Sequence, residues 1–432
     1  MIAGNGGRLS PGGLKERPLL WNTQATMDCK ENMGEPAARN ALTPGFVLGF
    51  LVLFAFMAAY HSLTPTLPLY LAKLGCHETE IGVLVGVVAV ASLISRLFAG
   101  GALARYSEKS VMAFGALLSA LSFLAYTIFR PFWPFFIARF FQGCSFACLD
   151  TAVLAFIVNV TPERFRGQAI GYVLLASPLA MAIAASLGVF LSNRYGFAVL
   201  FLSCVGLSLC SLFFSLVIKG QKNDRPRIKV SARGARLIDL KIAVPAFINF
   251  LNYFVGGALF AFIPLYGVKS GITNPGFFFS AVAVMLFTGR ILGGKILVAY
   301  DKEKIIVGFL SMFVAALVIL SFSHTLLMFV FVGLVWGTAL AFLVPASMAY
   351  ALEYAGSSEG TAVGTYQMFM DSGMALGPSV MGMVVPMVGY RVMFLCLALI
   401  CLANIGYFQF YVRKGRQRSV LRRADSRPIP GR

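Results

Sequence analysis

The chain between residues 44 and 412 is a succession of about a dozen apolar runs, each close to the roughly 20 residues that a helix needs to cross a bilayer. Polar and apolar residues do not alternate within these runs, so helices are favoured over the strands of a membrane barrel. Charged residues make up only 12% of the chain, whereas about a quarter of residues are charged in an ordinary soluble domain. The sequence therefore predicts an all-α membrane protein.

The runs divide the chain into two apolar halves. We expect a disordered cytoplasmic tail at 1–43, a first half at 44–218, a basic linker at 219–241, a second half at 242–412 and a basic tail at 413–432. The leading tail has no apolar segment of the signal-peptide type. The twelve expected spans are 44–71, the run that ends within 95–109, 111–129, 132–160, 167–191, 196–218, 242–267, 276–299, 304–323, 326–350, 361–386 and 390–412.

One stretch of the first half recurs in the second. Ser95–Lys109 and Gly289–Glu303 both carry an arginine, a glycine four residues later and a tyrosine ten residues later, and Arg96 and Arg290 are 194 positions apart. Other matches at nearly the same offset are Pro68-Leu69-Tyr70 with Pro264-Leu265-Tyr266, Gly75 with Gly271, and Gly196 with Gly389. This duplication predicts two parallel repeats of six helices each.

The positive charge of the chain predicts its orientation. The net charge of +19 is concentrated in the linker and the C-terminal tail, which does not favour nucleic-acid binding. Basic residues beside membrane spans normally mark the cytoplasmic side. They follow the expected spans two, four, six and eight, as Arg105 and Lys109, Arg164 and Arg166, the linker, and Lys302 and Lys304. Both termini are therefore expected in the cytoplasm, although the segment after span ten carries only Glu353 and Glu359 as charges.

No motif of an enzyme or of a resident cofactor occurs in the sequence. A phosphate-binding loop of the type Gly-x-x-x-x-Gly-Lys-Ser/Thr is absent, so ATP is not expected as the direct energy source. The sequence contains neither His-Glu-x-x-His nor paired Cys-x-x-Cys motifs for a metal. Most of the eight cysteines lie within apolar runs, where we expect them to pack rather than to form disulfides. We expect a protein that is not an enzyme and has no cofactor or metal.

Twelve spans in two parallel repeats, joined by a basic linker, resemble the major facilitator superfamily. Ser95–Lys109 is similar to the loop motif of that family between spans two and three. Arg139 followed by Gln142-Gly143 resembles the fourth-span motif, and Gly360–Pro378 resembles the eleventh span of bacterial sugar-efflux and drug-efflux members. The resemblance covers about residues 44–412 and implies a secondary transporter that works by alternating access.

The chain departs from the family pattern at several positions. Ala104 stands where the loop motif has an aspartate, Ser107 where it has a glycine, and Glu108 where it has the first of two basic residues. In the family the aspartate is thought to hold the cytoplasmic side shut, so the usual latch is not expected here. Ala184-Ala185 replaces the Gly-Pro of the fifth-span antiporter motif, whereas Gly377-Pro378 occupies the equivalent place in the second half.

Charged residues inside the spans are candidates for function, because an ionisable group costs roughly 2.5–3.5 kcal/mol at the centre of a membrane helix. Arg139 and Asp150 are eleven residues apart and share a helix face with Gln142. Arg139 could bind an anionic group or tune a carboxylate, and the alternative is a structural network between helices. Asp150 is a candidate proton carrier on the same grounds.

Asp371 lies in the middle of the eleventh span, with Gln367 one turn earlier. Desolvation favours the neutral acid, whereas a nearby arginine favours the carboxylate. A carboxylate that alternates between two such environments can load and release a proton, so Asp371 is the first candidate for proton coupling. The alternative is that Asp371 is a structural partner of Arg96 or Arg290.

Four further residues are candidates for proton coupling or substrate binding. His61 in the first span could carry a proton because histidine titrates near neutral pH, and the alternative is a packing role. Asn249, Asn252 and Tyr253 share one face of the seventh span, where they could bind substrate or join helices. The expected substrate-binding residues are Arg139, Gln142, Asn249, Asn252, Tyr253 and Gln367.

The repeated stretches are expected to control gating of the cytoplasmic side. Their arginines lie near the cytoplasmic ends of helices, where long basic side chains can reach the membrane surface. Their repetition favours a structural or gating role over substrate binding. The expected gating residues are Arg96, Gly100, Arg105, Lys109, Arg290 and Gly294.

These features predict a secondary active transporter that moves a small organic solute, with its site near the midplane between the halves. The resemblance favours proton-coupled efflux. Proton-coupled uptake of a sugar or organic acid is one alternative, and a non-transporting receptor or assembly factor on the same fold is another. Asp150 and Asp371 favour transport over the latter. The expected partners are a small-molecule substrate, protons and the lipid bilayer, with no nucleic acid, for a monomer in the cell membrane.

Overall fold

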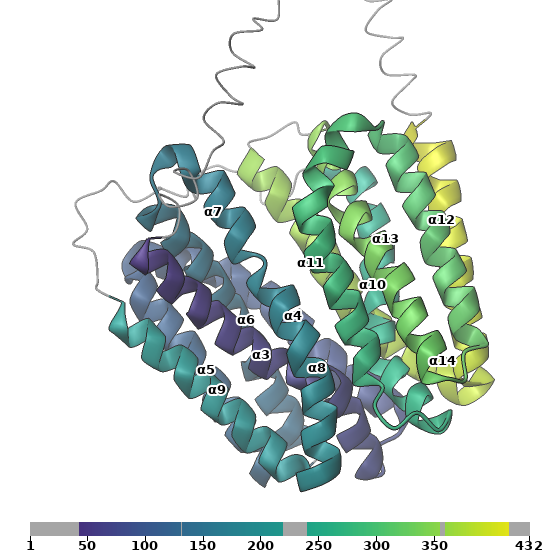
Figure 1. The fold of residues 1–432 in the computed structure, drawn as a ribbon, viewed down its shortest axis with the longest axis horizontal. Coiled ribbons are helices and arrows are strands. Elements are labelled where there is room, and N and C mark those ends of the chain that lie inside the picture. The colour runs from purple at the N-terminus through teal and green to yellow at the C-terminus, as the bar shows by residue number, and fades with distance from the viewer. Residues whose placement is uncertain (1–42, 131, 219–239, 355–358, 414–432) are drawn as a thin grey trace, which may run out of the picture.

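The computed structural model describes residues 43–130, 132–218, 240–354 and 359–413, and in these ranges the chain is helical with no strand. Almost all of the expected leading tail, the basic linker and the basic C-terminal tail lies outside the described residues. Figure 1 shows two helical bundles side by side, the first coloured purple to teal and the second green to yellow.

The first bundle contains the helices of the expected first half. Its elements are α3 (Pro44–Lys73), α4 (Glu78–Arg105), α5 (Glu108–Ile128), α6 (Trp133–Val160), the short 3₁₀ helix η1 (Glu163–Phe165), α7 (Arg166–Val173), α8 (Ala176–Tyr195) and α9 (Phe197–Val217). Helices α7 and α8 together form the expected fifth span, which is interrupted at Leu174 and Leu175. This interruption was not anticipated from the sequence.

The second bundle has the same order of helices. Its elements are α10 (Leu240–Lys269), α11 (Gly276–Ala299), α12 (Lys302–Ser321), α13 (Leu326–Leu352), α14 (Glu359–Tyr407) and the π-helix η2 (Phe408–Arg413). Helix α14 bends at Gly389, whose φ of 77° suits glycine, and so contains both the eleventh and the twelfth expected spans.

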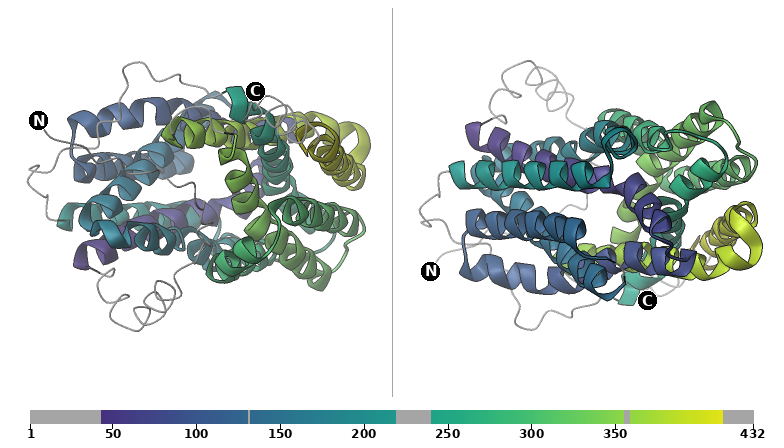
Figure 2. Two further views of the ribbon diagram at one scale, coloured as in Figure 1. Left: turned by 90° about the horizontal axis from the view of Figure 1, so that it is seen from above. Right: turned by 90° about the horizontal axis from the view of Figure 1, so that it is seen from below.

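The expected all-α fold with two six-helix repeats is confirmed. Ten of the described helical segments are long and apolar enough to cross a membrane, and 276–292 forms a shorter apolar helix. Because α14 accounts for two crossings, these segments provide the twelve expected spans. Figure 2 shows from two opposite directions that the helices of each bundle run roughly along a common axis.

The repeat is visible in how the helices begin and pack. Ser107 and Asp301, 194 positions apart, accept hydrogen bonds from backbone N–H groups at the starts of α5 and α12. Gly143 on α6 lies against Val88 of α4, and Gly337 on α13 lies against Val282 of α11. These glycine contacts also recur at an offset of 194, so the two bundles share the packing of their second and fourth spans.

The two bundles meet most closely at one end of the molecule. We call the end that carries the turn between Arg105 and Glu108 the basic end, and the other the opposite end. At the opposite end the first turns of α4 touch α14. A Cβ atom at Gly82 would meet the carbonyl of Pro378, and one at Gly86 would meet the carbonyl of Ala375. The helix backbones therefore approach more closely than larger residues would allow.

Hydrogen bonds between the bundles reinforce the contact at the opposite end. The Thr79 hydroxyl donates to the Gly382 carbonyl at 3.0 Å, and the Tyr390 hydroxyl donates to the Glu78 carboxylate at 3.3 Å. Helices α8 and α11 are joined in the same region, where the side chain of Asn274 donates to the Ser186 carbonyl at 3.1 Å. The opposite end is therefore closed by both packing and hydrogen bonds.

The basic end is packed loosely. A Cβ atom added at Gly100, Gly167 or Gly364 would have no neighbour within 4 Å. Arg96 and Arg290 make the cross-bundle contacts nearest to the basic end. Beyond them, no hydrogen bond or ion pair joins the bundles in the part of the chain that the structure describes. The described interface is thus closed at one end and open toward the other.

Candidate functional site

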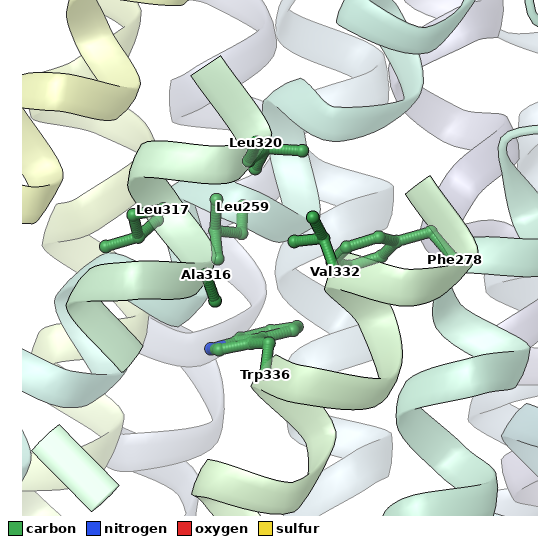
Figure 3. A pocket seen from close by; sticks show the side chains of 7 residues that line it. All are labelled: Leu259, Phe278, Ala316, Leu317, Leu320, Val332 and Trp336. Atoms are coloured by element: carbon green, nitrogen blue, oxygen red, sulfur yellow. The ribbon is translucent and has the colours of Figure 1, made fainter. Parts of the chain in front are cut away.

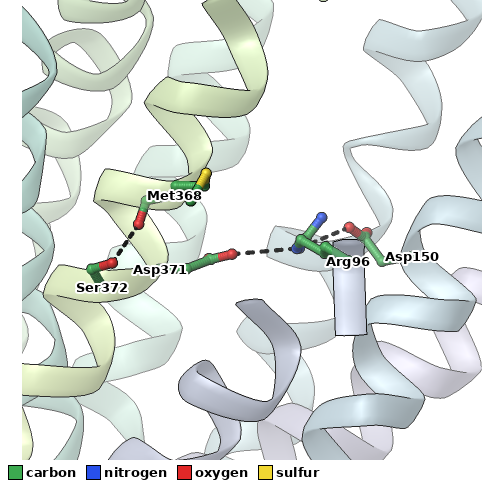
Figure 4. Close-up of polar contacts among 5 residues, drawn as sticks. All are labelled: Arg96, Asp150, Met368, Asp371 and Ser372. Carbon is green, nitrogen blue, oxygen red and sulfur yellow. Dashed lines mark hydrogen bonds and ion pairs between the residues drawn. The ribbon is translucent and has the colours of Figure 1, made fainter. Parts of the chain in front are cut away.

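A charged cluster lies between the bundles where the close packing ends. Arg96 of α4 forms ion pairs with Asp150 of α6 and with Asp371 of α14, and each closest N–O distance is 3.3 Å. Figure 4 shows Arg96 between the two carboxylates, with Asp371 reaching across from the second bundle. The sequence suggested Arg96 as one alternative partner of Asp371, but it did not indicate that Asp150 shares this arginine.

The two ion pairs differ in geometry. Arg96 Nη2 also donates a hydrogen bond to Asp150, whereas Arg96 Nε and the facing Asp371 oxygen are not aligned for one. All three side chains are between 16% and 24% exposed, so the cluster is shielded but reachable. With both carboxylates ionised the cluster carries a net negative charge. The link within the first bundle is therefore better formed than the link between bundles.

Aromatic side chains support the cluster from the first bundle. The Arg96 guanidinium lies 6.0 Å from the centre of the Phe146 ring, within the range of a cation–π contact. Phe146 packs against Tyr60 of α3, with ring centres 5.1 Å apart. Neither residue was identified from the sequence, although Phe146 precedes Asp150 by one helical turn and Tyr60 precedes His61.

His61 lies beside this aromatic pair, inside the first bundle. Its Nε2 atom is 3.1 Å from the hydroxyl of Ser177 on α8, and its ring contacts Tyr60 edge-on. The Nδ1 atom is buried without a hydrogen-bond partner among the described residues. His61 therefore joins α3 to α8 and is separate from the ion-pair cluster. Ser177 carried no signal in the sequence.

Arg139 and Gln142 form a buried network within the first bundle. Arg139 donates to the Leu84 carbonyl at 2.9 Å and to the Gln142 side chain, which also accepts from Tyr126 at 2.6 Å. Arg139 is only 5% exposed, which places its donors away from the space between the bundles. Its charge nevertheless lies within electrostatic reach of Tyr60.

Asn249 and Asn252 are buried inside the second bundle. Asn249 accepts from the Ser347 hydroxyl at 3.2 Å, and Asn252 accepts from the Asn404 amide at 3.1 Å. These contacts join α10 to α13 and to α14, which corresponds to the helix-joining alternative. Tyr253 behaves differently, because it is only partly buried and lies within electrostatic reach of both Arg290 and Asp371.

The remaining expected residues are distributed along the interface and at the basic end. Gln367 is partly buried one turn before Asp371, Gly100 faces open space and Arg105 is exposed at the end of α4. Lys109 donates to the carbonyls of Leu216 and Ile218 at 2.6 and 2.9 Å, and so ties α5 to the end of α9. Arg290 donates across the interface to the Leu174 carbonyl. Gly294 lies in a part of α11 whose side chains are not described.

An apolar gap inside the second bundle is not a candidate site. Leu259, Phe278 and Trp336 are among the residues that line it, as Figure 3 shows. The gap is too narrow to hold a water molecule and has no polar lining surface. This gap therefore cannot hold a solute of the expected kind.

Comparison with known proteins supports a transporter. A family model described as Major Facilitator Superfamily matches residues 48–358 and 246–429. The staphylopine export protein of Staphylococcus aureus is 23% identical over 83% of this chain and 93% of its own length. Multidrug resistance protein 1 of Bacillus subtilis is 25% identical over 74% of this chain and 84% of its own length.

Solved structures show the same fold. The crystal structure of the nucleoside transporter NupG superposes with a TM-score of 0.69 at 13% identity, covering 85% of this chain and all of that one. The structure of the human organic anion transporter MFSD10 gives a TM-score of 0.59 at 16% identity, with 85% of this chain and all of that one covered. The family match spans most of the chain, and the chain therefore belongs to the Major Facilitator Superfamily.

Proposed function

We propose that this secondary transporter exports a small organic solute in exchange for protons, and that Asp371 carries the coupling proton. The observation that supports this proposal most directly is the ion pair between Arg96 and Asp371, which links the two bundles across the candidate site. A proton on Asp371 removes one of the two charges that form this link. Proton binding and the relative position of the bundles are then coupled through a single carboxylate.

Asp150 has a different part in the proposed mechanism. It holds Arg96 within the first bundle through a hydrogen-bonded ion pair. When Asp371 is protonated, Asp150 still neutralises the arginine, so the cation is not left unpaired in a poorly solvated site. Asp150 is therefore a positioning residue for Arg96. Asp371 is the residue that alternates between the ion pair with Arg96 and a bound proton.

The proposed direction rests on the curated relatives and on loop charge. The relatives compared above are named as an export protein and a multidrug resistance protein. The basic end carries Arg105, Lys109 and Arg166, and such residues mark the cytoplasmic side. On this orientation the solute enters from the cytoplasm while the opposite end is closed. A reporter fused after Arg432 that is active only outside the cytoplasm should stay silent, and activity there would refute the orientation.

The test of proton coupling compares Asp371→Asn with Asp150→Asn in proteoliposomes. The probe is the compound that most raises the melting temperature of the purified wild-type protein in a ligand screen. Asp371→Asn should lose accumulation driven by a proton gradient by about tenfold or more, because a neutral amide cannot exchange a proton. It should still exchange labelled for unlabelled probe across the membrane.

Asp150→Asn is the matched control, because it removes the other carboxylate of the same arginine. It should retain gradient-driven accumulation at a reduced rate. Gradient-driven accumulation at the wild-type level in Asp371→Asn would refute the coupling role. Loss of coupling in Asp150→Asn alone would transfer that role to Asp150.

A further inference from the structure

The two arginines of the repeated stretches have unequal partners. Arg96 pairs with two carboxylates, Asp150 and Asp371. At the repeat offsets of 194 and 193, the positions equivalent to these aspartates are Val344 and Pro178. Neither of these residues carries a charge that could neutralise Arg290.

Arg290 is satisfied only in part. Its Nη1 donates to the backbone carbonyl of Leu174, which lies where α7 and α8 are interrupted. Among the described residues no carboxylate pairs with Arg290, and its side chain is exposed. One carbonyl occupies one of the five N–H donors of a guanidinium. The remaining donors are free for a ligand that enters between the bundles.

Arg290 lies at the depth of the candidate site. Both arginines precede the last residue of their helix by nine positions, which corresponds to about 13 Å at 1.5 Å per residue. An interrupted helix beside the midplane is a common setting for solute binding in transporters.

We propose that Arg290 binds a carboxylate of the transported solute. A guanidinium matches a carboxylate with two parallel hydrogen bonds, and this pairing is stronger than a single bond to a neutral carbonyl. The anion of the solute takes the place that a protein carboxylate takes beside Arg96. The Leu174 carbonyl borders the same position. The inference rests on the proposed transport function and specifies the class of solute, an organic acid or a zwitterion.

Binding of matched acids and esters tests this assignment. The probes are the carboxylate dye rhodamine 110 and its methyl ester rhodamine 123, together with a panel of aromatic carboxylic acids and their methyl esters. Affinities are measured on the purified full-length protein without a proton gradient, by fluorescence polarisation for the dyes and by thermal stabilisation for the others. The wild-type protein should bind at least one acid about tenfold tighter than the ester of that acid, because esterification removes the charge-assisted hydrogen bonds.

Three variants locate the preference for acids. Arg290→Gln should remove the preference, because the acid loses more affinity than its ester when the charged donor is gone. Val344→Asp should also remove it with Arg290 still present, because the new carboxylate occupies the position equivalent to Asp150. Arg194→Gln removes one exposed positive charge at the opposite end and should keep the preference.

Each result decides for or against the role of Arg290. A wild-type protein that prefers no acid over its ester overturns the assignment, whichever variants fold. So does a preference that persists in folded Arg290→Gln or folded Val344→Asp. The assay measures binding without a proton gradient, so it reports on Arg290 independently of proton coupling. A failure of proton coupling with the acid preference intact would therefore refute the proposed coupling and leave the Arg290 site standing.

Discussion

The two ends of the interface between the bundles are held by different kinds of contact. At the opposite end, glycines bring helix backbones together, as where Gly82 meets the Pro378 carbonyl. Toward the basic end, the last cross-bundle contacts are made by arginine side chains. Backbone packing depends on shape and responds little to ligands, whereas an ion pair responds to a proton or an anion. In the proposed mechanism, the proton or anion acts at the arginines and the opposite end follows.

The largest expected effect comes from filling the backbone contact at the opposite end. Gly82→Val places a branched side chain against the Pro378 carbonyl, and overpacking of this kind costs roughly 1–3 kcal/mol. The opposite end should open, and transport should fall by about tenfold or more. Spin labels at Lys73 and Met387 should show a longer distance by pulsed electron paramagnetic resonance.

Gly206→Val is the matched control, because a Cβ atom at Gly206 on α9 has no neighbour within 4 Å. It makes the same change of side chain in another helix of the first bundle. An unchanged label distance in Gly82→Val, or an equal change in the control, would contradict closure by backbone packing.

A smaller effect is expected at the charged cluster. Arg96→Gln should lower stability in an unfolding assay, and it should lower it by less in the Asp371→Asn background, where the ion pair between the bundles is already absent. The coupling energy should be about 1 kcal/mol, because the side chains are partly exposed and solvent screens the pair. The control cycle joins Asp371→Asn to Lys302→Gln, since Lys302 pairs with Glu353 instead. An equal effect of Arg96→Gln with and without Asp371→Asn would show that the ion pair between the bundles has no measurable coupling energy.

The smallest effect is expected from a single hydrogen bond at the opposite end. Tyr390→Phe removes the donor to Glu78 and should cost about 0.5 kcal/mol, because the bond is long at 3.3 Å and partly exposed. The population with the longer distance between the Lys73 and Met387 labels should rise only a few-fold. Ser203→Ala serves as control because the Ser203 hydroxyl bonds within α9. A shift as large as that of Gly82→Val would mean that hydrogen bonds rather than packing close this end.

Much of the fold was predictable because the bilayer imposes a simple rule on helix length. The spans, their number and the duplication all follow from apolar runs and from residues that recur at one offset. The interruption of the fifth span was not predictable in the same way. Its cause is one residue rather than a pattern: Pro178 has no N–H to bond the Leu174 carbonyl four residues earlier, and its ring crowds that carbonyl.

The candidate site was predictable in its residue types but not in its pairings. Asp371 and Arg96 stood out because charges are costly inside a membrane. Whether Asp150 pairs with Arg96 depends on how α6 is rotated against α4, which residue spacing alone does not fix. Spacing also placed Asn249, Asn252 and Tyr253 on one helix face, but it did not show what that face contacts. In the structure, Asn249 and Asn252 contact helices of their own bundle.

Four glycines with left-handed backbone lie at matching places in the two halves of the chain. Gly75 and Gly271 have φ values of 83° and 82°, and Gly196 and Gly389 have values of 89° and 77°. Both pairs occupy matching places in the two halves, where a side chain would strain the turn. The partners of the two arginines have meanwhile become different residues. After an ancestral duplication, backbone stereochemistry would have kept the turns alike. The interface could meanwhile acquire a net negative cluster around Arg96 and a net positive charge at Arg290.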